Sequence, residues 1–272
     1  MAGADKEERR TMDGNQLSAD ERRTKYSVPA VEKALDIIEY LSDKAVPLTQ
    51  TQLARALGRQ PGELFRMLTC LETRGYLRRD EVSGGYALTL KLFELSRTHS
   101  PYDELLTVAR PLMRQLADEV RETCHLSTLH QNQILVLAQE ESPKPIRLSV
   151  EAGSLHPVLV TTSGRILLAN MPDAARDAVL GEATDFFQRG EDERNTFLTR
   201  LLNIRQRGYE IADGERFVGG LDIGTLIGTP RSHVKAALII TTLKRADGPD
   251  LEAMLPVLQR YAQTIGERAG LS

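Results

Sequence analysis

Tryptophan is absent from the chain of 272 residues, and all aromatic residues together make up only 5% of it. This scarcity argues against a large ligand held between stacked rings. Only two cysteines occur, Cys70 and Cys124, each inside an apolar segment, so a disulfide framework is not expected. No apolar run reaches the ~20 residues that cross a bilayer, and the N-terminus lacks the apolar core of a signal peptide. These absences predict a cytoplasmic protein without a membrane partner.

A strong charge of either sign is also missing, since the formal net charge is −3. By segment, the net charge is 0 over residues 1–27, +1 over 28–99 and −4 over 100–272. If the chain binds DNA, the placement of its arginines must therefore matter more than their number. Residues 1–27 combine dense mixed charge with almost no apolar periodicity, which predicts a disordered, solvated tail.

Three helices are predicted after this tail. The first carries apolar residues at three- and four-residue spacing, namely Val28, Val31, Leu35, Ile38 and Leu41. The second is short, begins after a Thr49 cap and ends at Gly58, with Leu53, Ala54 and Leu57 facing inward. The third lies in GRQPGELFRMLTCLETRGYLRRD, residues 58–80, where Pro61 suits the first turn and Gly75 ends the helix. Its buried stripe is predicted to be Leu64, Leu68 and Leu71.

Two short β-type runs follow the third helix. YLRRD and GYALTL surround the turn VSGG, as the two strands of a ribbon would. Three helices followed by a two-stranded ribbon are typical of a winged helix-turn-helix.

The rest of the chain has a mixed α and β pattern, so the predicted fold class is α+β. A helical stretch from Asp103 to Val120 contains Pro111, which should kink it or start a new helix. Strands are predicted at CHLSTLH, ILVLAQ, PIRLSV and VKAALIITTL. Helices are predicted at SGRILLANM, residues 173–180, NTFLTRLLNIRQRG and LEAMLPVLQRYAQTIGERAG.

The face of the third helix opposite its leucines is the first candidate site. It carries small residues around one arginine: Gly62, Arg66, Thr69, Cys70 and Thr73. Such a face can lie close to a groove of double-stranded DNA, with Arg66 reaching base edges or phosphates. Further contacts are predicted for Arg59 and Gln60 before the helix, and for Arg78 and Arg79 in the ribbon. The alternative is a helical packing module whose solvated face binds nothing.

Glu63 fits this face poorly, because a carboxylate repels phosphates. In the first turn of a helix it favours the helix dipole and can cap backbone N–H groups, which is the preferred interpretation. The alternative is a hydrogen bond accepted from a cytosine amine.

Signs of catalysis or of a cofactor are lacking. The sequence holds no GxSxG, HExxH or P-loop motif, and no base stands at a recognisable spacing from Ser163, which is better interpreted as a helix cap. Cys124, His125 and His130 fall short of a zinc pattern, because no second Cys/His cluster accompanies them. We therefore expect neither an enzyme nor a metal site, and no cofactor.

Two stretches carry a family resemblance. They are VPAVEKALDIIEYL…LTQTQLARALGRQPGELFRMLTCLETRGYLRRDEVSGGYALTLKLFEL and HLSTLH…ESPKPIRLSVEAGSLHPVLVTTSGRILLA…LLNIRQRGYEIADGE…GGLDIG…VKAALIITTL. In order and spacing these blocks resemble the IclR family of bacterial transcriptional regulators over nearly the whole chain past residue 27. Arg66 matches the family's arginine in the recognition helix. Gly62 and Glu63, in contrast, stand where the family commonly has two small hydroxyl residues.

The resemblance implies a domain plan. After the tail, 1–27, it places a winged helix-turn-helix over 28–97, a linker helix with dimer contacts over 98–121, and an effector-binding domain over 122–272. The last is expected to be GAF-like, with a mainly antiparallel sheet. Operator DNA would be bound by a dimer or a dimer of dimers, with two recognition helices in successive major-groove turns.

The resemblance also implies a site for a small-molecule effector. VTTSGR at 160–165 matches the segment that lines the family's cavity, so Thr162, Ser163 and Gly164 are predicted to contact the ligand, with backbone N–H groups holding a carboxylate. Other predicted ligand contacts are Asp213, Asp222, Ile223, Ile239 and Thr241. A small carboxylic acid or aldehyde acid is the expected ligand. The bland alternatives are a turn residue at Asp213 and plain core at Ile239.

The leading hypothesis is a repressor of a catabolic operon that a small metabolite releases from its operator. An activator would use the same DNA contacts. A metabolite-binding enzyme whose N-terminal helices only dimerise is the alternative from another class. A third alternative, suggested by Glu63 and the nearly neutral winged segment, is a regulator that has lost specific DNA binding.

Overall fold

The chain forms two compact units, residues 1–99 and 100–272, each with its own core. The computed structural model describes residues 27–99, 102–215, 217–245 and 250–271; the predicted tail, up to residue 26, lies outside them. Helix α6, Asp103–Val120, falls within the predicted linker, and it packs into the core of the second unit.

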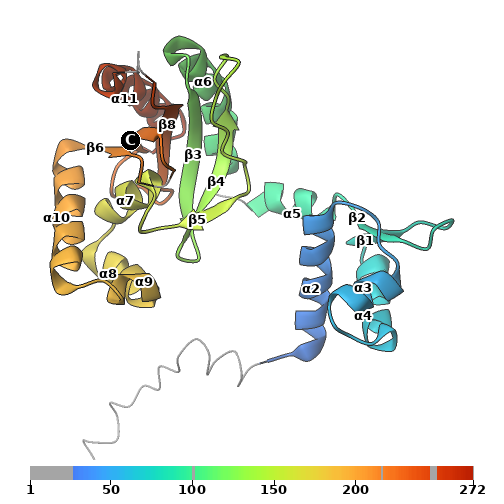
Figure 1. The fold of residues 1–272 in the computed structure, drawn as a ribbon. Coiled ribbons are helices and arrows are strands. Elements are labelled where there is room, and N and C mark those ends of the chain that lie inside the picture. Colours follow the sequence, from blue (N-terminus) through green and yellow to red (C-terminus); the bar gives the residue numbers. More distant parts are fainter. Residues whose placement is uncertain (1–26, 100–101, 216, 246–249, 272) are drawn as a thin grey trace, which may run out of the picture. The chain divides into compact units, whose positions relative to one another are not determined.

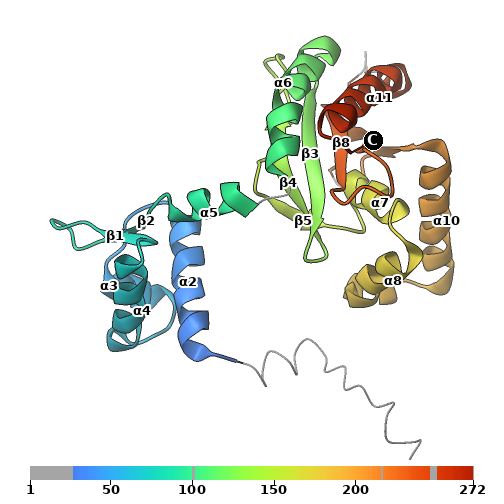
Figure 2. The same cartoon turned by 180° about the vertical axis from the view of Figure 1, so that it is seen from behind.

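The N-terminal unit has the predicted order of three helices and a ribbon. Its elements are α2 (Pro29–Lys44), α3 (Gln50–Ala56), α4 (Pro61–Thr73), β1 (Leu77–Arg79), β2 (Tyr86–Leu88) and α5 (Lys91–His99). Figures 1 and 2 show this unit from opposite sides. The strands pair antiparallel, with Arg78 opposite Ala87. The winged helix-turn-helix is thus confirmed.

Local signals fix the bounds of these helices. Thr49 and Gln52 form a reciprocal capping box at the start of α3, which satisfies two backbone N–H groups. Pro61 is the first residue of α4, and Gly75 after its end has a φ of +77°, a conformation that glycine adopts without strain. The predicted leucine stripe of α4 is buried, with Leu64 and Leu68 fully enclosed.

Helix α2 differs from the prediction along its first half. Its apolar stripe predicts one buried face, yet Val28, Val31 and Leu35 are 55%, 54% and 50% exposed. Only Ile37 and Leu41 of this helix are buried. The unit therefore leaves a row of apolar side chains on its surface.

The C-terminal unit is built on one six-stranded antiparallel sheet with the strand order β5-β4-β3-β8-β7-β6. Its strands are β3 (Thr123–His130), β4 (Gln133–Glu140), β5 (Leu155–Pro157), β6 (Tyr209–Asp213), β7 (Gly220–Ile227) and β8 (Ala236–Leu243). Its helices are α6, α7 (Thr162–Ala169), α8 (Asp173–Glu182), α9 (Thr184–Phe187), α10 (Glu191–Arg207) and α11 (Leu251–Arg268). The predicted α+β class is confirmed.

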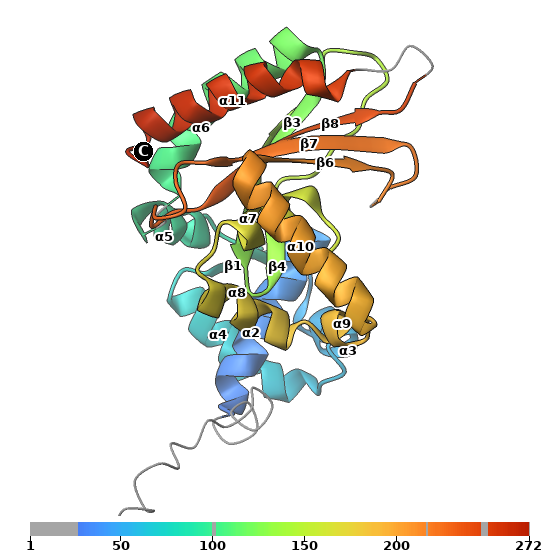
Figure 3. The same cartoon turned by 90° about the vertical axis from the view of Figure 1, so that its left-hand side faces the viewer.

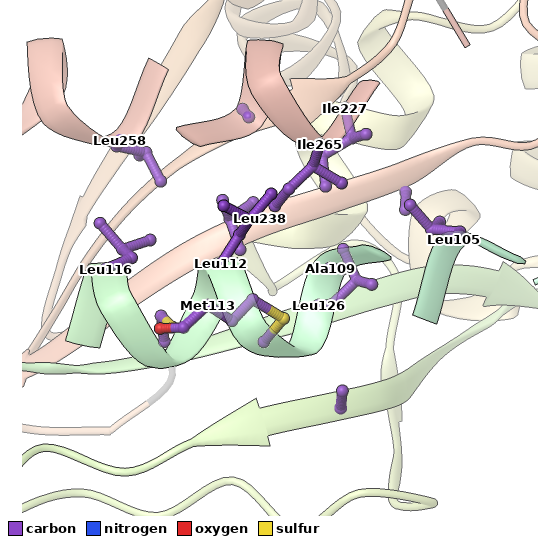
Figure 4. Close-up of a cluster of buried hydrophobic side chains, with 14 of the residues drawn as sticks. Leu105, Ala109, Leu112, Met113, Leu116, Leu126, Ile227, Leu238, Leu258 and Ile265 are labelled. Carbon is purple, nitrogen blue, oxygen red and sulfur yellow. The ribbon is translucent and has the colours of Figure 1, made fainter. Parts of the chain in front are cut away.

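Helices cover both faces of this sheet (Figure 3). Because side chains alternate along a strand, Leu238 and Ile240 of β8 pack under α6 and α11, whereas Ala237 and Ile239 face the side of α7 and α10. Figure 4 shows the first of these cores between α6 and α11. Strand β8 is buried from Ala236 to Thr242, so each of its faces supports a different helical layer.

One strand prediction fails in this unit. PIRLSV, residues 145–150, is not a strand: Thr123 Oγ1 donates to the Leu148 carbonyl at 2.7 Å, and the Val150 N–H donates to the Gln139 side chain. Hydrogen bonds to the side chains of Thr123 and Gln139 thus take the place of pairing with a neighbouring strand. The next strand, β5, begins further along the chain. Of the two outcomes predicted at Pro111, a kink or a new helix, the new helix does not occur, because α6 continues through the proline. Strands β5, β6 and β7 and helix α9 were not predicted from the residue pattern.

Helix α7 lies unusually close to the chain that precedes it. A Cβ built on Gly164 would be 1.9 Å from the Val158 carbonyl oxygen, a distance that no side chain can tolerate. A Cβ on Gly224 of β7 would be 2.7 Å from Ile166 Cδ1 of α7 and 2.1 Å from Ile239 Cδ1. Both glycines therefore serve close packing.

We expect Gly164→Ala to lower the free energy of unfolding by about 1–3 kcal/mol, because the new methyl group collides with backbone. Gly181→Ala in α8 is the matched control, since nothing lies within 4 Å of its Cβ position. That variant should gain stability, by about 0.5–1 kcal/mol. Urea melts of the full chain would measure both, and equal stability of the two variants would contradict the close approach.

Candidate functional site

The first candidate site is the exposed face of α4. Arg66, Gly62 and Thr69 are all exposed, opposite the buried leucines. Nothing lies within 4 Å of the Cβ position of Gly62, so another surface can come close to the backbone there. The Thr69 hydroxyl donates to the Phe65 carbonyl at 2.9 Å. Among the described residues, no carboxylate forms an ion pair with Arg66, which leaves the guanidinium available to a partner.

Glu63 has a partner that the sequence did not reveal. Its carboxylate accepts a hydrogen bond from Lys33 Nζ of α2 at 2.9 Å. This hydrogen bond and the charge of Lys33 lower the pKa of Glu63, while Arg59 and the Gln60 backbone N–H contribute less. The predicted capping role is thus minor beside an ion pair between two helices. The pair also neutralises the carboxylate at the edge of the candidate face.

The remaining predicted DNA contacts flank this face. Arg59 and Gln60 precede α4 and are exposed. Arg78 and Arg79 are exposed on β1, and the Arg79 guanidinium lies 5.5 Å from the centre of the Tyr86 ring. One residue was missed: Phe65, next to Arg66, is 54% exposed. An exposed phenylalanine on a recognition helix can contact a thymine methyl group.

The second candidate site is a cavity of about 340 Å³ in the C-terminal unit, on the α7 side of the sheet. A row of residues on adjacent strands contributes to it, because Asp222 is paired with Thr241 on one side and with Ala212 on the other. The start of α7, residues 148–150, residues 214 and 215, Phe217 and Gly220 complete the walls. The lining is His125, Val136, Leu148, Ser149, Val150, His156, Val160, Thr161, Thr162, Ala212, Gly214, Glu215, Phe217, Gly220, Asp222 and Thr241. Its volume suits a small molecule.

Three of the eight predicted ligand residues line this cavity, namely Thr162, Asp222 and Thr241. Ile223 points to the opposite face of the sheet, where it packs with α6 and α11. Asp213 lies outside the lining, exposed and paired with Lys244 Nζ at 2.8 Å. Ile239 is buried core beneath α7 and not part of the lining. The alternative of plain core thus fits Ile239, whereas Asp213 is the last residue of strand β6 and not a turn residue.

Ser163 and Gly164 were predicted to hold a ligand carboxylate through their N–H groups, and neither lines the cavity. The Gly164 N–H is already used, because it donates to the Thr161 hydroxyl at 3.2 Å. Thr161 is therefore the cap of α7, in place of Ser163. The carboxylate at the start of this helix belongs to the protein itself, since Thr162 Oγ1 donates to Asp222 Oδ2 at 3.0 Å.

His125 is a cavity residue that the sequence did not assign to ligand binding. Its side chain is only 7% exposed, and Nδ1 has no hydrogen-bond partner among the described residues. Burial lowers the pKa of His125 to about 4; Asp222 acts in the opposite direction and His156 adds to the shift. The imidazole is therefore neutral at pH 7. An unpaired buried polar atom in a cavity wall is a natural place for a ligand hydrogen bond.

A buried ion network adjoins the same cavity and was also missed. Arg165 of α7 and Glu210 of β6 are 2% and 0% exposed, and Arg165 Nε donates to Glu210 Oε1 at 3.0 Å. Arg200 of α10 donates to Glu210 at 2.6 Å and to Glu215 at 2.7 Å. Arg165 Nη1 lies 2.9 Å from Glu215 as well. Glu215 thus joins the network to the cavity wall.

Neither candidate site is built like a metal centre. Within the described ranges, no three His, Cys, Asp or Glu side chains gather as metal ligands would. Burial raises the pKa of the Cys124 thiol to about 12, and its Sγ donates to the Met113 carbonyl. Among the described residues, no helix is long and apolar enough to cross a membrane.

The pKa of His125 predicts an acid-dependent loss of stability. Below pH 6.5 an unfolded histidine takes up a proton, whereas the folded one does not until about pH 4. Stability that is present above pH 6.5 should thus fall by at most about 3 kcal/mol as the pH drops from 6.5 to 4. His125→Phe should remove this component, and His130→Phe, at the exposed end of the same strand, should leave it unchanged. Thermal melts across this pH range would test it; identical acid profiles for both variants would refute it.

Comparison with known proteins matches the two units to models of the same family. Residues 30–81 match the model of the IclR helix-turn-helix domain, and residues 101–267 match that of the bacterial transcriptional regulator IclR C-terminal region. The glycerol operon regulatory protein of Streptomyces coelicolor is 28% identical over 79% of this chain and 85% of its own. The regulator KdgR of Escherichia coli is 28% identical over 67% of this chain and 70% of its own.

Solved structures share the fold. An IclR homolog from Microbacterium hydrocarbonoxydans, crystallised with 4-hydroxybenzoate, has a TM-score of 0.74 at 22% identity and covers 89% of this chain and 100% of its own. The IclR of Thermotoga maritima has a TM-score of 0.64 at 19% identity and covers 88% and 98%. One family model matches more than half of the chain, and a second matches the segment that contains α4. The chain therefore belongs to the IclR family of DNA-binding transcriptional regulators and is not an enzyme.

Proposed function

We propose that this chain is a cytoplasmic repressor of a catabolic operon, which binds operator DNA through α4 and is released by a small molecule in the cavity of its C-terminal unit. The observation that carries the proposal is Arg66, which has no ion-pair partner in the part of the chain that the structure describes and lies on an exposed face of small residues. A guanidinium there can donate two hydrogen bonds to a guanine in the major groove. The name of the Streptomyces relative, a glycerol operon regulator, supports control of a catabolic operon.

The contacts of the winged unit divide into two kinds. We assign Arg66 and Phe65 to contacts with base edges, and Gly62 to the close approach of the helix backbone. Arg59, Gln60 and Thr69 around the helix, and Arg78 and Arg79 on β1, are assigned to the phosphate backbone, which fixes the register on the duplex. The net charge over residues 28–99 is only +1, so the general electrostatic attraction to DNA is weak. The affinity must therefore depend on where the arginine side chains lie.

The surface row of α2 supports self-association. Val28, Val31 and Leu35 are each half exposed or more, and Leu92 of α5 adds an exposed apolar side chain on another helix of the same unit. Apolar side chains at successive turns of a helix face a partner in most soluble proteins. A second copy of the chain would cover them and bring two recognition helices to adjacent half-sites. We therefore assign the dimer contact to these helices in place of α6.

The proposal is tested by fluorescence anisotropy of the full chain with labelled DNA from upstream of its own gene. Specific binding should exceed binding to unrelated DNA by about 10³-fold or more. Arg66→Ala should weaken it by about 1–3 kcal/mol. Arg268→Ala, which removes the same charge from α11, is the control and should bind normally.

Specific binding that is unaffected by Arg66→Ala would refute the role of α4. Equal affinity for all DNA sequences tested, across tiled fragments of the surrounding genome, would support the alternative of a regulator without an operator. Transcription in vitro separates repressor from activator, because an activator would raise transcript levels from the same site.

Glu63 provides an independent test of the groove-facing surface. In Glu63→Gln the Lys33 ammonium loses its partner and becomes available to a phosphate. We expect tighter non-specific binding and a salt dependence steeper by about 0.9 in the slope of log K against log salt, as one added phosphate contact would give.

Glu72→Gln, near the other end of α4, is the matched control, because Glu72 has no ion pair among the described residues and its removal should leave the slope unchanged. If Glu63 instead accepts a hydrogen bond from cytosine, Glu63→Gln will weaken specific binding and relax the preference at one base pair. That result would overturn the ion-pair explanation.

A further inference from the structure

The chain between β4 and β5 forms part of the cavity wall, although residues 141–154 contain neither a helix nor a strand. Figure 1 shows this segment as the yellow-green chain that joins the two strands. Its residues Leu148, Ser149 and Val150 line the cavity. We call residues 143–152 the strap.

Both ends of the strap are fixed. Before it, the N–H of the buried Ser142 donates to Thr123 Oγ1 at 3.0 Å, and the Ser142 hydroxyl donates to a carbonyl of the chain that leads into β3. After it, the Gly153 N–H donates to the Val136 carbonyl at 2.8 Å, and the Val136 N–H donates to the Ser154 carbonyl at 3.1 Å. The middle of the strap can therefore move while its ends stay in place.

Side chains hold the middle of the strap to the sheet. Within the described residues, no backbone–backbone hydrogen bond joins residues 143–150 to a strand. Thr123 Oγ1 donates to the Leu148 carbonyl at 2.7 Å. Gln139 makes two bonds, since its Nε2 donates to Ser149 Oγ at 2.7 Å and its Oε1 accepts from the Val150 N–H.

The first half of the strap has ion pairs close to its fixed end. Lys144 Nζ donates to Glu122, and Arg147 Nε donates to Glu141 Oε2 at 2.6 Å. Ile146, between these two basic residues, is 74% exposed. Ser149 Oγ also donates to Glu141 at 3.2 Å. Because Glu141 precedes the strap and lies outside β4, these contacts do not attach the cavity-lining half to a strand.

Gln139 rises from the face of β4 that carries the cavity. Its neighbour Ala138 packs in the core under α6 and α11, so the alternation of side chains places Gln139 on the other face. Water can replace the hydrogen bonds of this side chain at a small net cost. Leu148 and Val150 can then leave the cavity without breaking any strand pairing, as is typical of the least stable segments of a fold.

We propose that the strap is the gate through which a ligand enters and leaves the cavity, and that Gln139 holds this gate closed. The inference rests on the proposed function, since it concerns access to the same effector site. The cavity floor belongs to paired strands of the sheet, and α7 is held against the Val158 carbonyl. Opening either would break the packing of the unit, whereas the strap opens alone.

Thiol labelling of the full chain measures this opening. Thr241 lines the cavity from β8 and is 5% exposed, so Thr241→Cys places a reporter thiol inside. Cys70→Ser removes the exposed native thiol. Cys124, buried on the α6 side of the sheet, remains as an internal standard, because it can be labelled only when the whole unit unfolds. The probe is N-ethylmaleimide at pH 7.5, with each thiol followed by mass spectrometry of its peptide.

Gln139→Met in this background keeps the length of the side chain but can no longer make the two hydrogen bonds. We expect the thiol introduced at position 241 to be labelled about tenfold faster, as the loss of one or two hydrogen bonds gives, with the rate at Cys124 unchanged. Thr123→Val, which removes the hydroxyl bound to the Leu148 carbonyl, should act in the same direction. Gln133→Met, at the exposed start of β4, is the matched control and should leave the rate unchanged.

An unchanged rate at position 241 in folded Gln139→Met would overturn the gate, because the probe would then enter by another route. A rate that rises equally at Cys124 would overturn it as well, since the whole unit would be opening.

Failure of this inference and failure of the proposed function give different results. Faster labelling in Gln139→Met, in a chain without specific DNA binding in the anisotropy assay, would refute the regulator and leave the gate standing. Specific DNA binding with labelling that Gln139→Met does not change would refute the gate and leave the regulator standing.

Discussion

The close approach of α7 to its surroundings is the constraint on which the C-terminal unit depends. Two positions without a Cβ make it possible, since Gly164 lies against the Val158 carbonyl and Gly224 lies under Ile166. Arg165, one residue after Gly164, is then brought into the interior and must meet Glu210, because an unpaired guanidinium at that depth would be prohibitively costly. The cavity exists where α7 begins, so its shape, its cap and its internal carboxylate all follow from where this helix is held.

The main role of the buried ion network is to fix how α7, α10 and β6 pack against one another. An ion pair of this kind contributes little net stability, because the desolvation of both charges offsets most of their attraction. Its members come from three elements, α7, α10 and β6, and Glu215 continues the network to the cavity wall. Leaving any one partner unmatched is expensive, so the network specifies a single packing of these elements. A ligand that contacts Glu215 would therefore contact a residue of the network that fixes the packing of these elements.

Local signals made part of this structure predictable from sequence. The bounds of α4 follow from Pro61 and Gly75, and the α3 cap follows from Thr49, because these effects act within one helical turn. Long-range pairing was not predictable: Lys33 and Glu63 are 30 residues apart, and Arg165 and Glu210 are 45 apart. The cavity shows the same limit. Asp222 and Ile223 are neighbours in sequence, yet alternation on β7 sends one into the cavity and the other into the opposite core, and only the register with β8 decides which.

One electrostatic theme links the two units. The first turn of a helix attracts anions, because its backbone N–H groups are free and the helix dipole is positive there. This chain supplies its own carboxylate at both places, Glu63 in the first turn of α4 and Asp222 beside the first residue of α7. Each is held by a partner, Lys33 or Thr162. In the proposed function, DNA recognition then depends on Arg66, which forms no ion pair among the described residues. Because the net charge over residues 28–99 is only +1, the proposed DNA contacts must be selected by geometry more than by bulk charge.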